Sequence, residues 1–430
     1  MAATRPGRLP GRHRRSPESR ATYGEVIAIG EFRALWAGQC LSLLGDQLAQ
    51  VALALLVYDR TGSPLATAAV YALTYLPPIL GGPLLAGLAD RYPRRRVMIV
   101  CDVARAVLVG LMALPGMPFP VLCALVFLVV LLSSPFTAAR AALLPEILEG
   151  DRYVAGSGLQ NMTNQAAQML GFAVGAGMIA TIGPHRGLAL DAVTFLASAL
   201  ILAVGVRRRP APELEDGVPA SMWSMTKAGA KLVFGDRRLR TLVLFAWLCG
   251  FYVLPEGIAV PYAATFSDDP RTITVITGLL MAAMPTGTVV GAFVFARFVS
   301  PTRRLRAMGW MAMLSCAPLI GCAMRPPVAV VLALWTLAGI GGAYQLAANA
   351  AFVQCVPANR RGQAFGLVQS GLLGAQGIGI LIGGAAAQVL GPEPVVALAG
   401  ASGLSVAALL AVLWAESRAE IITRVRAQVT

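Results

Sequence analysis

Two acidic residues lie inside long apolar stretches of the chain, where a charged group is costly. Asp46 falls near the middle of the first stretch and Glu256 in the outer part of the seventh. An ionisable group at such a depth usually faces a water-filled cavity or a partner. A carboxyl group there can exchange a proton for a cationic or polar molecule, so we expect Asp46 and Glu256 to couple protons or to bind cargo. The alternative is that both only form hydrogen bonds that hold helices together.

We expect four more charged residues in or beside these stretches to have a structural role. The alternative is that they take a direct part in function. Asp102 and Arg105 are three positions apart, a helical spacing that allows a local ion pair. Arg140 nears the inner end of the fourth stretch, and we expect it to pair with an acid at an inner gate. Asp191 begins the sixth stretch at the outer surface, where we expect water to reach it.

Uncharged polar residues also gather in two of the stretches. In the fifth, four amide side chains follow one another at steps of three, one and three, which places them on one helical face. Such a face either hydrogen-bonds to neighbouring helices or lines a polar cavity. The candidates are Asn161, Asn164, Gln165 and Gln168 in the fifth stretch, and Tyr344, Gln345 and Asn349 in the tenth.

The elements that position these residues follow from the composition. Of the 430 residues, 57% are hydrophobic and only 13% are charged, about half of the ~25% typical of soluble domains. Runs of about 20 apolar residues are long enough to cross a bilayer as helices. The sequence therefore predicts an all-α membrane protein with twelve transmembrane helices. The predicted runs are residues 35–58, 65–87, 97–114, 121–143, 159–182, 187–206, 242–263, 274–295, 308–322, 328–352, 365–390 and 395–414.

The basic residues predict the orientation. With the N-terminus in the cytoplasm, all but five of the 35 Lys and Arg residues fall in segments on the cytoplasmic side. Such a bias predicts that both termini are cytoplasmic in a multi-pass protein of the cell membrane. The net charge of +14 is thus a topology signal. It does not indicate nucleic-acid binding, because the basic residues are spread over many short segments.

The chain also carries traces of a repeat. Residues 138–142 (AARAA) return as residues 347–351 (AANAA), 209 positions later, and Asp46 and Glu256 are 210 positions apart. An offset near half the chain length predicts two similar six-helix bundles around a central site, with the two acids in nearly equivalent places. The predicted units are a disordered basic cytoplasmic tail (1–31), an N-terminal bundle (32–206), a cytoplasmic linker with an interfacial helix (207–240), a C-terminal bundle (241–416) and a cytoplasmic tail (417–430).

The loop between the second and third stretches holds the most specific motif, which reads GLADRYPRRR over residues 87–96. It resembles the signature of the major facilitator superfamily, with Pro93 where that family usually has glycine. A degenerate second copy, at residues 296–304, keeps the basic pair and lacks the acid. The resemblance implies the major facilitator fold, with two pseudo-symmetric bundles, and a gating role for Gly87, Asp90, Arg91, Arg94 and Arg95.

Within that superfamily the chain is similar to the macrolide and siderophore efflux branch, of the drug:proton antiporter type. The similar residues are 35–39, 45–46, 57–63 and 139–145. One departure concerns the fifth stretch, where many drug/proton antiporters carry a Gly-Pro-rich signature. Residues 171–177 have glycines there but no proline.

These observations predict a secondary transporter and not an enzyme. We expect proton-driven efflux of a moderately hydrophobic small molecule by alternating access, without a cofactor and as a monomer in the lipid bilayer. A facilitator or importer of a small metabolite or siderophore is a second hypothesis. A membrane scaffold or lipid-handling protein that transports nothing is a third.

Overall fold

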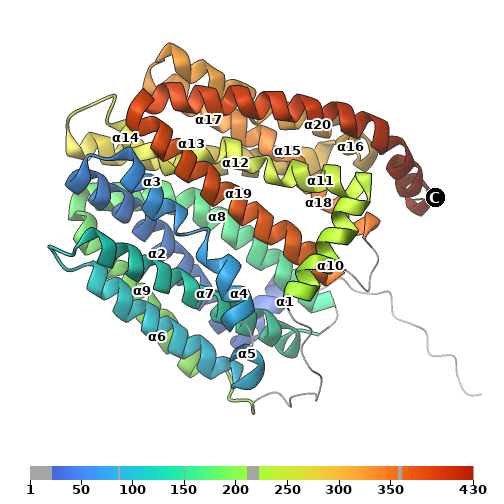
Figure 1. Ribbon diagram of the computed structural model, residues 1–430. Helices are drawn as coiled ribbons and strands as arrows, with labels where there is room; N and C mark the ends of the chain where they lie inside the picture. The colour runs from blue at the N-terminus through green and yellow to red at the C-terminus, as the bar shows by residue number, and fades with distance from the viewer. Residues whose placement is uncertain (1–21, 86–87, 150, 211–221, 357–360, 430) are drawn as a thin grey trace, which may run out of the picture.

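The computed structural model describes residues 22–85, 88–149, 151–210, 222–356 and 361–429. Within these ranges all regular elements are helices, and no strand is present. The elements form two bundles, which Figure 1 shows in blue to green for the N-terminal half and in yellow to red for the C-terminal half. The expected all-α architecture is confirmed.

In the N-terminal half the chain crosses the bundle six times. The second crossing consists of two short helices, because Pro77 and Pro78 follow the break at residues 73–76 and cannot continue the backbone hydrogen bonds of α3. The helices are α1 (Tyr23–Ala28), α2 (Gly30–Thr61), α3 (Pro64–Ala72), α4 (Pro77–Leu85), α5 (Leu88–Arg91), α6 (Arg94–Met112), α7 (Phe119–Ile147), α8 (Asp151–Ile182) and α9 (Pro184–Gly205).

The C-terminal half repeats this pattern of six crossings. Its first crossing is broken into four pieces, with Pro255 and Pro261 inside the two that lie farthest along the chain. The elements are α10 (Met222–Gly235), α11 (Arg237–Trp247), α12 (Cys249–Tyr252), α13 (Leu254–Gly257), α14 (Ala259–Ala263), α15 (Pro270–Phe298), α16 (Pro301–Leu314), the 3-10 helix η1 (Ala317–Met324), α17 (Val328–Gly342), α18 (Tyr344–Cys355), α19 (Arg361–Leu390) and α20 (Pro392–Val429).

Ten helical segments of the described chain are long and apolar enough to span a membrane. Two expected crossings are not among them. The second is divided between α3 and α4, which have nine residues each. The third, α6, has 19 residues but begins with three arginines and carries Asp102 and Arg105.

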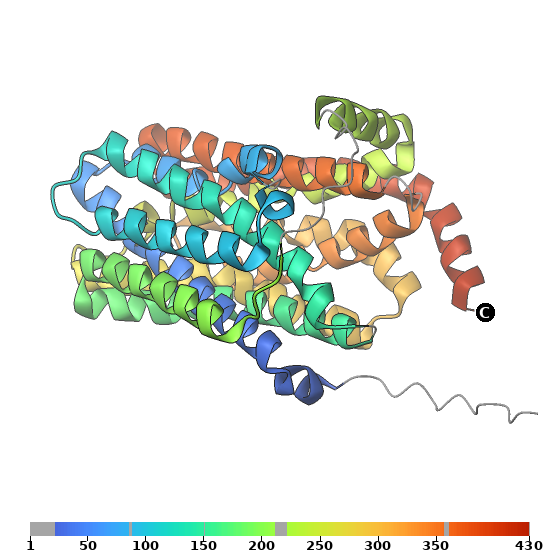
Figure 2. The same cartoon turned by 90° about the horizontal axis from the view of Figure 1, so that it is seen from below.

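Helix α1 and the end of α20 lie at the same end of the molecule, as Figures 1 and 2 show. We call this the terminus-bearing end and the other the opposite end. Helix α10, at the terminus-bearing end, occupies the second part of the linker, where the composition predicts a helix. Helix α1 falls within the segment expected to be a tail, residues 1–31, and α20 continues as a helix through most of residues 417–430.

The two halves meet mainly where α19 packs on α3 and where α8 packs on α15. Small residues let these helices approach closely: Gly384 of α19 lies against Ala68, and Gly278 of α15 lies against Ala176. Two hydrogen bonds between described residues join the halves near the opposite end. Ser63 donates to the side chain of Gln388 at 2.8 Å, and the phenol of Tyr71 in α3 donates to Glu256 in α13.

Candidate functional site

The N-terminal half contains a buried arginine that binds two acids. Arg105 of α6 donates to the carboxylate of Asp46 on α2, with N–O distances of 3.0 and 3.3 Å. The same guanidinium lies 3.7 Å from Asp102, one helical turn earlier, so the predicted local ion pair is present. Asp102 is fully buried and accepts a hydrogen bond of 2.7 Å from Ser198 of α9. These contacts tie α2, α6 and α9 together through charge.

A third acid completes this group, which we call the charge cluster: Asp46, Asp102, Arg105 and Asp191. Asp191 is only 1% exposed, and in the described structure no basic side chain lies within ion-pair distance of it. The expectation that Asp191 sits at a water-exposed surface is therefore wrong. It lies seven residues into α9, where Gly45 lets α2 pack so closely that a methyl group there would overlap the Asp191 carboxylate.

Besides these acids, Arg105 contacts an aromatic ring. The guanidinium carbon lies 4.0 Å from the centre of the Phe195 ring, a distance typical of a cation–π contact. Two carboxyl groups thus share one guanidinium in the interior of a membrane-spanning bundle, and the third, that of Asp191, lies nearby without a described cation. With all three ionised, the charge cluster would carry two uncompensated negative charges.

A cavity of about 240 Å³ adjoins the charge cluster. Its described lining comes from the N-terminal half alone and includes Asp46, Arg105 and Asp191 together with Gln50 and Ser133. The side chain of Asp46 remains 32% accessible because it faces this cavity. Asp46 can therefore reach water or a proton donor, whereas Asp102 cannot.

Glu256 has a different setting. It lies on the short helix α13, is 6% exposed, and accepts a hydrogen bond of 3.0 Å from the phenol of Tyr71 in the other half. Asp46, in contrast, bonds only within its own half. The expectation that the two acids occupy equivalent places is wrong with respect to their contacts. Asp46 on α2 lies inside one bundle, whereas Glu256 on α13 lies at the interface between the halves.

Between the halves lies a second, larger space, which we call the central cavity. It consists of adjoining pockets of about 310 and 510 Å³ that share Gln165, Thr288 and Gln345. Glu256 lines the first pocket, and Asn349 lines the second, nearer the terminus-bearing end of α18. The volume falls in the range of ligand sites. The N-terminal half contributes to the lining through Tyr75, Gln165 and Gln168.

The amide face of α8 is divided between two roles. Asn164 accepts a hydrogen bond of 2.9 Å from Gln39 of α2, which is the interhelical contact expected of such a face. Gln165 and Gln168 face the central cavity. Asn161 is exposed. The structure thus combines both interpretations of the pattern.

The polar residues of α18 are divided in the same way. Tyr344 is fully buried in the C-terminal half and donates to the carbonyl of Phe245 at 2.7 Å, so it does not line the cavity as expected. Gln345 lines the central cavity and donates to the phenol of Tyr252 at 3.2 Å.

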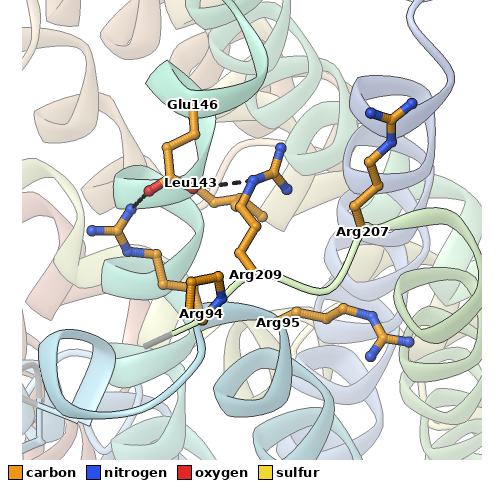
Figure 3. Close-up of a pocket in the computed structure, with 7 residues that line it drawn as sticks. Arg94, Arg95, Leu143, Glu146, Arg207 and Arg209 are labelled. Atoms are coloured by element: carbon orange, nitrogen blue, oxygen red, sulfur yellow. Dashed lines mark hydrogen bonds and ion pairs between the residues drawn. The ribbon is translucent and has the colours of Figure 1, made fainter. Parts of the chain in front are cut away.

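The arginines of the loop motif bind within the N-terminal half. Arg94 forms an ion pair with Glu146 and donates to the carbonyl of Ala142 at 3.0 Å, and Arg95 donates to the carbonyl of Ala203. Figure 3 shows Arg94 pointing to Glu146. Arg91 is exposed. Gly87 and the side chain of Asp90 lie outside the described residues.

Arg140 is partly buried near the terminus-bearing end of α7. Within the described ranges it forms no ion pair, although one with an acid at the inner gate was expected. The nearest acid along α7, Glu146, is six positions away and faces a different side of the helix. Glu146 is bound instead by Arg94 and Arg209.

Three partners of these residues were not identified from the sequence. Ser198 and Phe195 lie on the same face of α9 as Asp191, at spacings of seven and four, which is a signal that was available. Tyr71 is 185 positions from Glu256, and no local pattern links them.

Comparisons with known proteins agree with this architecture. The family model of the Major Facilitator Superfamily matches residues 35–269 and 254–424. The chain is similar to the Multidrug efflux pump Tap of Mycolicibacterium fortuitum, with 27% identity over 380 residues covering 84% of this chain and 88% of the relative. It is also similar to Macrolide efflux protein A of Streptococcus pyogenes, with 22% identity over 284 residues covering 64% and 68%.

Two solved structures have a similar fold. The nucleoside transporter NupG gives a TM-score of 0.64 at 15% identity, covering 88% of this chain and 98% of that one. A bacterial homologue of the iron transporter ferroportin, in an inward-facing state, gives 0.65 at 16% identity, covering 90% and 98%. These likenesses concern the fold.

Proposed function

Because the chain belongs to the Major Facilitator Superfamily and is therefore a multi-pass membrane transporter, we propose that it exports a moderately hydrophobic small molecule in exchange for protons. Its place is the cell membrane, with the terminus-bearing end in the cytoplasm. The bias of basic residues toward that side supports this orientation. Relatives named as multidrug and macrolide efflux pumps support export of hydrophobic compounds.

The charge cluster carries the proposal of proton coupling. Two carboxyl groups pair with one guanidinium inside the membrane-spanning bundle, a third carboxyl group is buried nearby, and uncompensated charge there is costly. Protons bound by the cluster remove that cost. Asp46 and Asp191 both line the adjoining cavity, and Asp46 is by far the more exposed of the two, so it is the group that exchanges protons with water. Asp102 pairs with Arg105, and Asp191 lies against Gly45, next to Asp46, so both acids set the charge that Asp46 experiences.

The central cavity is the proposed cargo site. Amides, tyrosines and one carboxyl group, that of Glu256, supply its polar lining, and no basic side chain is among its described lining residues. Apolar residues such as Leu372, Val243 and Phe352 supply much of the rest. This chemistry suits an apolar molecule with a positive or hydrogen-bonding group and does not suit a phosphate or a carboxylate.

Alternating access follows from how the halves are joined. In this conformation they are hydrogen-bonded near the opposite end, and the central cavity extends toward the terminus-bearing end. Cargo therefore enters from the cytoplasm and meets Glu256 at the innermost part of the cavity. A cationic group on the cargo competes with Tyr71 for the carboxylate, and loss of that hydrogen bond favours opening to the outside.

Everted membrane vesicles test this function. With an acidic interior established, addition of a macrolide or a fluorescent lipophilic amine should dissipate the pH gradient faster in vesicles that contain the protein than in vesicles without it, since these weak bases also cross lipid unaided. A facilitator or importer would move the same compound without changing the gradient. A membrane scaffold would do neither. Either of these two outcomes would reject proton-coupled efflux.

A further inference from the structure

A third pocket lies at the terminus-bearing end, away from both the charge cluster and the central cavity. It has a volume of about 350 Å³ and is lined by four arginines, Arg94 and Arg95 of α6 and Arg207 and Arg209 of the linker, together with Glu146. Figure 3 shows Arg94 and Arg209 directed at Glu146, whereas the side chains of Arg95 and Arg207 extend away from it. We call this space the arginine pocket. Its walls come from helices of the N-terminal half and from the segment that leads to the C-terminal half.

The charges of the arginine pocket do not balance. Arg209 forms an ion pair with Glu31, in which Nη2 donates to Oε2 at 3.1 Å. The Nε of Arg209 also lies 3.4 Å from Oε2 of Glu146, and Glu146 forms a further ion pair with Arg94. The hydrogen bond to Glu31 raises the pKa of Arg209, so it stays charged. Among the described residues four guanidinium groups thus meet two carboxylates, and two of the positive charges have no carboxylate partner there.

The uncompensated charges belong to Arg95 and Arg207. The guanidinium of Arg95 donates to a neutral acceptor, the carbonyl of Ala203, and its Nε is buried without any partner. The guanidinium of Arg207 is exposed and forms no hydrogen bond or ion pair with a residue in the described ranges. In the described ranges neither guanidinium has an anionic partner, and a guanidinium matches the geometry of phosphate oxygens.

A helix end adds to this field. Helix α6 begins at Arg94 after Pro93, and no side chain caps it. The backbone N–H groups of Arg94 and Arg95 precede the first helical hydrogen bonds, so they remain available at the positive end of the helix dipole. An anion near a helix N-terminus is stabilised by both effects.

We propose that the arginine pocket binds a phosphate group, carried either by an anionic lipid or by a soluble phosphate compound. The bound phosphate bridges α6 to the linker and neutralises the charges of Arg95 and Arg207. Because the linker joins the two halves, such a bridge restrains how the halves move. The pocket is thus a regulatory site, separate from the cargo route.

Binding to the purified full-length protein tests this proposal. One arm uses phosphatidylcholine nanodiscs with increasing fractions of phosphatidylglycerol and measures retained phosphatidylglycerol by native mass spectrometry. The other uses phosphatidylcholine nanodiscs and titrates inorganic phosphate by calorimetry. Saturable binding in the first arm identifies a lipid, and saturable binding in the second identifies a soluble phosphate.

The variants Arg95→Gln and Arg207→Gln should each weaken that binding by about tenfold, the effect of losing one charge-assisted hydrogen bond. Arg207→Gln removes a side chain without a described acceptor, so a failure to fold does not confuse its result. Arg240→Gln, which removes an exposed charge at the same end, should bind as the wild type does. The proposal is overturned if neither probe binds saturably, if both pocket variants bind normally, or if Arg240→Gln weakens binding equally.

Discussion

The phenol of Tyr71 and the carboxylate of Glu256 are joined by a 3.0 Å hydrogen bond that connects the two halves of the protein. Both side chains are buried, and the bond lies at the inner limit of the central cavity. A hydrogen bond to a carboxylate contributes about 1.5–3 kcal/mol. Glu256, the proposed cargo ligand, thus also helps to hold the two halves together near the opposite end.

The first prediction concerns that contact. Tyr71→Phe keeps the ring and removes only the donor, so it should shift the population toward opening at the opposite end by about tenfold or more. Spin labels at exposed positions 61 and 271, one in each half, report this opening as a longer distance between the labels. The background should lack the seven native cysteines.

Tyr58→Phe is the matched control, because Tyr58 is partly buried on α2 and its phenol has no hydrogen bond to the other half. An unchanged distance distribution in Tyr71→Phe, or an equal change in Tyr58→Phe, would show that the contact does not hold the halves together.

The second prediction concerns Arg105. Arg105→Gln leaves Asp46 and Asp102 without their cation, close to the buried Asp191, and should lower the free energy of unfolding by about 3–5 kcal/mol. The loss should shrink as the pH is lowered, because protons neutralise the acids. Reversible unfolding in mixed micelles, measured over a range of pH, provides the comparison.

The double variant Asp46→Asn/Arg105→Gln should recover part of that loss, since one of the orphaned acids is then neutral. Arg271→Gln, on the exposed first turn of α15, should have no such effect. Strict additivity in the double variant would mean that Asp46 and Arg105 are not coupled.

The third prediction concerns the close packing of α2 on α9. A methyl group at Gly45 would overlap Asp191 and Thr194, so Gly45→Ala should destabilise the protein by about 1–3 kcal/mol. Gly177→Ala is the control, because no atom lies within 4 Å of its added carbon, and alanine there should be neutral or stabilising. Equal thermal stabilities of the two variants would contradict the geometry of the charge cluster.

Much of the fold could be predicted because it follows from composition and run length. The apolar runs predict the membrane crossings, and the spacing of Asp102 and Arg105 predicts their ion pair. Pro77 and Pro78 indicate the break between α3 and α4, although residues 65–87 form one continuous run by hydropathy alone.

The candidate site was less predictable, because its partners come from distant parts of the chain. Asp191 appears at the start of an apolar run, yet the structure buries it, since Gly45 lets α2 cover it. The offset of 210 between Asp46 and Glu256 suggests equivalent roles. Their partners, Arg105 and Tyr71, both lie in the N-terminal half and are not separated by that offset. Long-range packing decides such contacts, and no local pattern records it.

The central claim, that Asp46 exchanges the proton that drives export, is tested most directly in proteoliposomes with the pH recorded on both sides. Asp46→Asn should abolish pH-driven accumulation of the cargo while downhill movement of the same compound persists. Asp59→Asn, an exposed acid on the same helix, should transport as the wild type does. Undiminished pH-driven accumulation by Asp46→Asn would contradict the account.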